Sequence, residues 1–205
     1  MFPIPYRLLS NYNSILKNVF SLLIFLMVFK AEAQSSASVI ADSLYATGNF
    51  TNAINYYAQV GNQKSSLQIA RAYNTIGNYE KAVAQYENLV DAAPELQIAR
   101  FELGKLYLKI KRFDDARKLF TAIASNDASN PEYLYYLGES FRELEQIASS
   151  LVAYKKAVSV DSTHLRSLFQ LGKYFVVKQE RNEAVKYIDM GLQFYENDVS
   201  LINLK

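Results

Sequence analysis

Small residues recur at a fixed interval along this chain, and that spacing constrains the fold more than any other feature. Gly104, Gly138 and Gly172 lie 34 residues apart, and Ala70 and Ala41 continue the series toward the N-terminus. Three further series keep the same intervals: Ala53, Ala82, Ala116, Ser150 and Ala184; Tyr57, Tyr86, Phe120, Tyr154 and Ile188; Leu44, Tyr73, Tyr107, Phe141 and Phe175. Self-similarity at an interval of a few tens of residues is typical of repeat proteins, in which each unit buries its apolar face against its neighbours.

These series resemble the pattern of the tetratricopeptide repeat family, W-x2-L-G-x2-Y followed by A-x3-F and P. The third repeat supplies Leu103-Gly104-x2-Tyr107 and Ala116-x3-Phe120, and the second, fourth and fifth repeats follow in the same register. The resemblance implies an all-α fold, a right-handed α-solenoid of about five helix-turn-helix repeats. The expected repeats are 34–62, 63–96, 97–130, 131–164 and 165–198, followed by the stub of a capping or sixth-repeat helix at 199–205.

The spacing also predicts local structure. The first repeat is shorter than the others at its junction with the second, so we expect its second helix to be shortened. The glycine of each first helix should lie where the second helix crosses closely, and a larger side chain there would cost about 1–3 kcal/mol. Gly48 and Gly77 suit turns that need positive φ. The later repeats have Lys111-Arg112, Glu145-Gln146 and Glu180-Arg181 there, so we expect their turns to be less sharply defined.

Residues 1–33 have the order of a secretory signal. Residues 1–18 carry two basic and no acidic side chains, an apolar run of eleven residues spans 19–29, and Ala31-Glu32-Ala33 precedes an expected cleavage site before Gln34. The run is shorter than the roughly 20 residues that cross a bilayer. An uncleaved anchor and a buried core helix are the alternatives. We therefore expect an exported protein, periplasmic or secreted.

Composition excludes several kinds of chemistry. The chain has no cysteine and one histidine, which removes disulfides, thiol nucleophiles and cysteine-based zinc sites. Three of the 22 basic and one of the 20 acidic residues precede Gln34, so the mature chain is balanced in charge and a nucleic-acid partner is not expected. No nucleotide-binding glycine motif and no H-E-x-x-H motif is present. His164 lies in a polar segment typical of a helix start. We predict no catalytic residue, no metal site and no cofactor.

The remaining functional feature is the surface of the first helices, which lines the concave face in the resembled family. Aromatic and arginine side chains with a charged border have the composition of a binding hot spot. The predicted partner-binding residues are Leu67, Arg71, Phe101, Lys105, Leu108, Tyr135, Glu139, Arg142, Phe169 and Lys173. The alternative is that Phe101 and Phe169 pack between repeats, because aromatic stripes at helical spacing are commonly core.

The sequence therefore predicts a non-catalytic scaffold of the cell envelope that binds a protein or peptide segment in its concave groove. Two alternatives remain: a sensor or docking segment of a longer membrane-anchored signalling protein, suggested by the apolar residues after Ser200, and an enzyme, for which Glu139 beside Arg142 is the nearest candidate pair. Self-association through the C-terminal repeat also stays open, since Phe194 and Tyr195 are expected to be only partly covered there.

Overall fold

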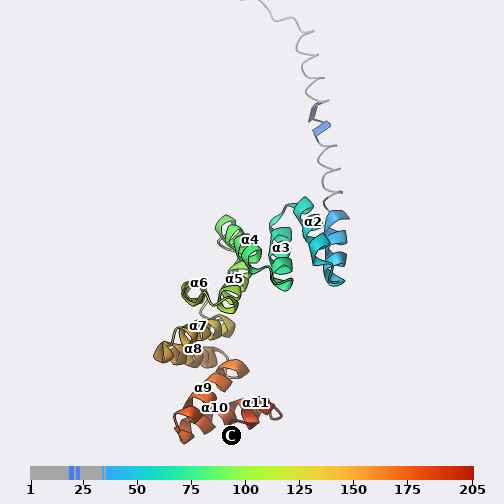
Figure 1. The fold of residues 1–205 in the computed structure, drawn as a ribbon. Coiled ribbons are helices and arrows are strands. Elements are labelled where there is room, and N and C mark those ends of the chain that lie inside the picture. Colours follow the sequence, from blue (N-terminus) through green and yellow to red (C-terminus); the bar gives the residue numbers. More distant parts are fainter. Residues whose placement is uncertain (1–18, 21, 24–33, 35) are drawn as a thin grey trace, which may run out of the picture. The chain divides into compact units, whose positions relative to one another are not determined.

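The computed structural model describes residues 19–20, 22–23, 34 and 36–205 (Figure 1). The predicted signal peptide, residues 1–33, lies almost entirely outside the described residues. In the described part every regular element is a helix, which confirms the all-α prediction. None of the helices described is long and apolar enough to cross a membrane. Internal contacts divide the chain into two compact units, Met1–Asn78 and Tyr79–Lys205, a division that falls inside the expected repeat 63–96.

The first unit contains a helical segment at residues 36–46, followed by α2 (Phe50–Val60) and α3 (Gln63–Thr75). Ala41 and Ala53 have no exposed surface and share a core with Tyr57. Asn62 and Ser65 form a reciprocal capping box that starts α3. Helix α2 has 11 residues where α4 has 14, so the expected shortening of the first repeat is confirmed.

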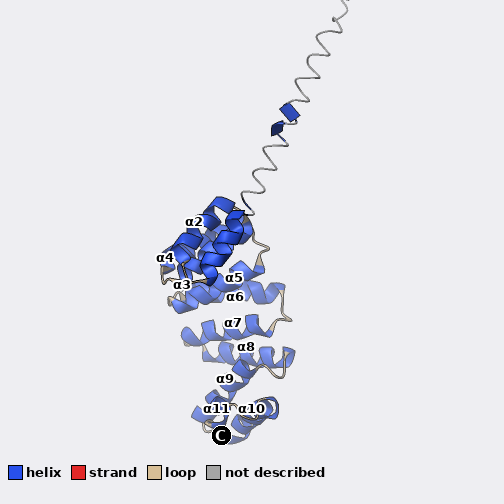
Figure 2. Cartoon of the chain, turned by 90° about the vertical axis from the view of Figure 1, so that its right-hand side faces the viewer, coloured by secondary structure: helices blue, strands red, loops and turns tan. Residues whose placement is uncertain are grey.

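The second unit, described throughout its length, packs each helix against the next one in chain order. Figure 1 and Figure 2 show the hairpins that α5 and α6, α7 and α8, and α9 and α10 form. Each of the expected ranges 97–130, 131–164 and 165–198 contains one of these pairs. The helices are α4 (Tyr79–Ala92), α5 (Gln97–Lys109), α6 (Phe113–Asn126), α7 (Pro131–Glu143), α8 (Ile147–Val160), α9 (Leu165–Val177), α10 (Arg181–Phe194) and α11 (Val199–Ile202).

Glycines of the first helices lie directly under large side chains of the second helices. A Cβ added at Gly104 would lie 2.6 Å from the Phe120 ring, and one added at Gly172 would lie 3.0 Å from Ile188. At Gly138 the added atom would collide with the ring of Tyr154. These contacts confirm that the two helices of each hairpin approach closely at the glycine. They also fix the orientation of the first helix relative to the second.

The turns within the hairpins correct one prediction. Gly48 and Gly77 have φ values of 79° and 78°, but Lys111, Glu145 and Gln179 also adopt positive φ, at 63°, 59° and 59°. In every case the next residue donates its N–H to the carbonyl five residues back, at 2.8–3.0 Å: Asn49 to Leu44, Asn78 to Tyr73, Arg112 to Tyr107, Gln146 to Phe141 and Glu180 to Phe175. This bond closes the helix end in the same way in all five turns. The expectation of less defined turns in the later repeats is wrong, because the hydrogen bond holds the left-handed residue whatever its side chain.

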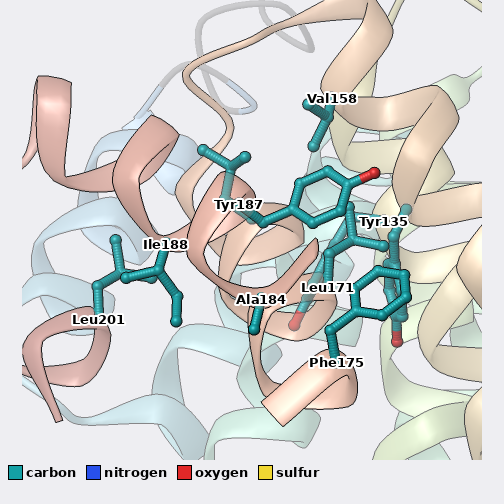
Figure 3. Packing of buried hydrophobic residues seen from close by; sticks show 10 residues of the cluster. Tyr135, Val158, Leu171, Phe175, Ala184, Tyr187, Ile188 and Leu201 are labelled. Carbon is teal, nitrogen blue, oxygen red and sulfur yellow. The ribbon is translucent and has the colours of Figure 1, made fainter. Parts of the chain in front are cut away.

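The C-terminal core of the second unit brings α9, α10 and α11 together (Figure 3). Phe175 and Tyr187 stack with ring centroids 5.7 Å apart, and Leu201 of α11 is fully buried against Gly191 of α10. The short α11 therefore covers part of the last hairpin. Phe194 remains 53% exposed beside it, in line with the expected partial cover.

Candidate functional site

Eight of the predicted partner-binding residues lie on α5, α7 and α9 of the second unit. Within a helix they are spaced at i, i+4 and i+7, which places them on one face. Lys105, Arg142 and Lys173 are exposed, Tyr135 is buried, and Phe101, Leu108, Glu139 and Phe169 are half-buried. Leu67 and Arg71 lie on α3 in the first unit, where Leu67 is buried and Arg71 is half-buried.

Five rings from α5, α6 and α7 form an aromatic cluster: Phe101, Phe120, Tyr133, Tyr135 and Tyr136. The Phe101 centroid lies 5.3 Å from both Tyr133 and Tyr136, and Phe120 stacks on Tyr136 at 5.5 Å. Contacts of this kind stabilise a structure beyond the area they bury. Phe101 thus packs between successive hairpins, as in the alternative interpretation of the sequence.

Two cations of the chain cover the aromatic cluster. The Lys105 ammonium lies 5.4 Å from the Phe101 centroid and 5.5 Å from that of Tyr136. The Arg166 guanidinium lies 4.7 Å from the Tyr135 centroid and also donates a hydrogen bond of 3.0 Å to the Tyr136 hydroxyl. Cations at these distances are attracted to the ring faces. The rings of the cluster therefore contact mainly other rings and cations of the same chain.

Glu139 of α7 is held by two hydrogen bonds. The Tyr154 hydroxyl donates to one carboxylate oxygen at 2.6 Å, and Arg142 donates to the other at 2.9 Å. Burial and the bond to Glu139 raise the pKa of Tyr154 well above its usual range. Partial burial would lower the pKa of Arg142, but the hydrogen bond and charge of Glu139, with the charge of Glu143, raise it above its ordinary value. The Glu139–Arg142 pair thus serves the packing of α7 on α8.

In two repeats the residue equivalent to Glu139, or Glu139 itself, is acidic and accepts a hydrogen bond from the tyrosine opposite it. In the second repeat the equivalent residue is Arg71, and the hydroxyl of Tyr86 donates to Glu102 instead. In the first unit Asp42 accepts a hydrogen bond of 2.6 Å from Tyr57, just as Glu139 does from Tyr154. At the equivalent positions of the second unit, Lys105 is paired in sequence with Phe120, and Lys173 with Ile188, neither of which has a hydroxyl. Among the described residues neither lysine has a carboxylate partner. The charge of each lysine is therefore not neutralised by a carboxylate of the described residues.

An open groove of about 330 Å³ lies between α7, α8 and α9. We call it the α7–α9 groove. It brings together two predicted residues, Arg142 and Lys173, and Ile147, Leu151 and Val177 provide apolar side chains. The complete lining is Arg142, Ile147, Ser150, Leu151, Tyr154, Gln170, Lys173, Tyr174 and Val177. Its volume is at the small end of the range for ligand pockets, which suits a few side chains of a bound segment.

His164 lies between Ser167 and Glu132, a combination that looks like a nucleophile, base and acid. The Ser167 N–H donates to Nδ1 at 3.3 Å, so the imidazole caps α9, while Nε2 lies 3.3 Å from Glu132. Ser167 has no exposed surface, and a buried hydroxyl cannot meet a substrate. His164 therefore joins the start of α9 to α7, and its predicted place at a helix start is confirmed. No group of three or more potential metal ligands gathers among the residues described.

A family model described as tetratricopeptide repeat matches residues 67–131 and 101–163. This part of the chain therefore contains tetratricopeptide repeats, which confirms the resemblance over residues 67–163. A search of curated proteins found no match.

Solved structures show the same fold. Residues 41 to the end of MamA from Desulfovibrio magneticus RS-1 are 20% identical with a TM-score of 0.72, covering 82% of this chain and 97% of that one. Another MamA structure is 23% identical, with a TM-score of 0.71 and coverage of 81% and 93%. YrrB, described as a tetratricopeptide repeat protein with an unusual peptide-binding site, is 14% identical, with a TM-score of 0.66 and coverage of 82% and 89%. These likenesses confirm the predicted fold class.

The structure adds residues that the sequence analysis did not select. Arg166 lies on the same helical face as Phe169, one turn before it, and Tyr136 directly follows Tyr135 on α7. Counting further rows along the first helices would have found both. Ile147 and Leu151 of the second helix α8 supply the apolar wall of the groove. Counting positions along the first helices alone could not identify them.

Proposed function

We propose that this chain is a non-catalytic interaction scaffold that binds a segment of a partner protein along the first helices α5, α7 and α9. The observation that carries the proposal is the α7–α9 groove, in which exposed cations stand beside apolar side chains and Lys173 has no carboxylate partner among the described residues. The peptide-binding site described for YrrB supports the same use of the fold. The lack of an exposed nucleophile at His164 gives the enzyme alternative no further support.

Site-specific photocrosslinking in the native organism tests this proposal. A photoreactive residue at Val176, which is 38% exposed on α9, should form an adduct with a partner protein. The matched control is Val152, which is 68% exposed on α8 and lines a different hollow. Adducts that form at Val152 and not at Val176, or none at either position in a folded chain, would contradict the proposal.

We further propose that the chain works outside the cytoplasm, on the basis of residues 1–33. The supporting features are the basic start, the apolar run and the small residues before Gln34. Cell fractionation and N-terminal sequencing test it. A mature chain that begins at Gln34 is the expected result, whereas an intact cytoplasmic chain would contradict export and an intact membrane-bound chain would indicate an anchor.

A further inference from the structure

We infer that the α7–α9 groove binds an acidic side chain together with a neighbouring aliphatic side chain of the partner segment. The inference rests on the proposed function and specifies the ligand of that site. It commits the groove to a short acidic–aliphatic stretch of polypeptide.

The charges in the groove favour a carboxylate. Its charged lining residues are Arg142 and Lys173, and no acidic side chain lines it. Arg142 uses one terminal nitrogen for both Glu139 and Glu143, although a guanidinium carries five N–H donors in all. Lys173 is exposed and has no carboxylate partner among the described residues. A partner carboxylate would complete this arrangement at Lys173.

The wall of the groove favours an aliphatic neighbour. Val177 is 73% exposed and Ile147 is 40% exposed, although both are large apolar residues. Leu151 and Tyr174 also line the groove and are half-buried. Covering this wall with an aliphatic side chain removes apolar surface from water on both partners. The volume of about 330 Å³ accommodates side chains and excludes a folded domain.

The same features disfavour a nucleic acid. A run of phosphates needs several uncompensated cations along its path. Beside the groove, however, Glu139 and Glu143 both pair with Arg142, so that a second phosphate would approach carboxylates. The apolar wall also offers nothing to a phosphate. A single carboxylate with an apolar neighbour matches the site better.

The test uses the chain as processed in an exporting host and short Gly/Ser peptides with a central Asp-Leu pair. Matched peptides carry Asn-Leu, Lys-Leu or Asp-Ser, and NMR chemical-shift titration detects weak binding. We expect the Asp-Leu peptide to bind at least tenfold more tightly than Lys-Leu, with shifts at Lys173 and Val177. Lys173→Glu should reverse this preference, and Val177→Ser should reduce the preference for Asp-Leu over Asp-Ser severalfold. Lys156→Glu, an exposed charge of α8 that lines another hollow, is the control and should change neither preference.

The outcomes separate this inference from the proposed function. If a partner crosslinks at Val176 but the peptides show no preference for Asp over Asn and Lys173→Glu changes nothing, the inference is overturned and the scaffold function stands. If the preference is present and follows the charge at residue 173, the inference is supported. If Lys156→Glu also abolishes the preference, the effect arises from the net charge of the protein, and the assignment to the groove is overturned.

Discussion

The aromatic cluster and the α7–α9 groove both contain residues of the first helices, yet their side chains have different roles. In the cluster, Phe101 and Tyr136 contact other rings and the cations Lys105 and Arg166 of their own chain. In the groove, Lys173 faces solvent next to exposed apolar residues. An aromatic row at helical spacing therefore forms the joint between repeats here. We propose binding where that row gives way to lysine and aliphatic residues.

Removing a central ring of the aromatic cluster should give the largest difference in stability between a cluster variant and a groove variant. Phe120→Ala deletes a fully buried ring that packs on Phe101 and Tyr136 and should lower the free energy of unfolding by about 3–5 kcal/mol. Val177→Ala in the groove, where the side chain is 73% exposed, should change it by less than about 0.5 kcal/mol. Urea unfolding followed by circular dichroism measures both. Equal losses of unfolding free energy in the two variants would contradict the different roles of the cluster and the groove.

Alkaline pH should remove the contribution that Tyr135 of the aromatic cluster makes to stability. Burial and the charge of Glu139 raise the pKa of Tyr135 to about 12. The unfolded phenol titrates near pH 10, so this contribution to stability is present below about pH 10 and is lost as the pH rises toward 12. Tyr135→Phe should make the fall in unfolding free energy over this window shallower. Denaturant titrations at several pH values measure it, and an unchanged slope would remove Tyr135 from the alkaline response.

The bond between Tyr154 and Glu139 lies between the two regions and should have an intermediate effect. Tyr154→Phe keeps the ring that packs on Gly138 but removes the 2.6 Å bond to the carboxylate, at a cost of about 1–2 kcal/mol. Lys173→Met is the matched change in the groove and should leave stability nearly unchanged. A Tyr154→Phe variant as stable as the original chain would show that Arg142 alone satisfies Glu139.

The turn beside the groove offers the smallest change, and in the stabilising direction. Glu145 has φ of 59°, a conformation that glycine adopts without strain. Glu145→Gly should raise the free energy of unfolding by about 0.5–1 kcal/mol while leaving the groove residues in place. Gly77→Ala, at φ of 78°, should lower it. Thermal unfolding measures both, and destabilisation by Glu145→Gly would show that this side chain contributes to the turn.

The sequence predicts the helices and their crossings well because the regular interval of the small residues depends on both. Gly104, Gly138 and Gly172 are small for a steric reason that acts within a single hairpin, so the pattern of one repeat is enough to reveal it. The turns at Lys111 and Glu145 escape prediction because a backbone hydrogen bond, which leaves no trace in side-chain choice, holds them in the left-handed region.

The site was less predictable than the fold. Whether Phe101 faces solvent or packs depends on Phe120 and Tyr136, which come from other helices and can be placed only in three dimensions. The groove likewise depends on Ile147 of α8, a residue outside the rows of the first helices. Arg142 and Lys173, both predicted from the sequence, line the same groove, and their role in binding stays a prediction.

The pairing of Glu139 with Tyr154, and of Lys105 with Phe120, has a consequence for how such a surface changes over generations. Replacing Glu139 by lysine alone would leave the Tyr154 hydroxyl without its acceptor, and replacing Tyr154 by phenylalanine alone would leave Glu139 with one bond fewer. Each single substitution passes through a less stable intermediate, whereas the double substitution reproduces the combination already present in the third repeat. A change of charge at this position should therefore be accompanied by loss of the opposite hydroxyl, as at Phe120, or by a new acceptor, as Glu102 provides for Tyr86.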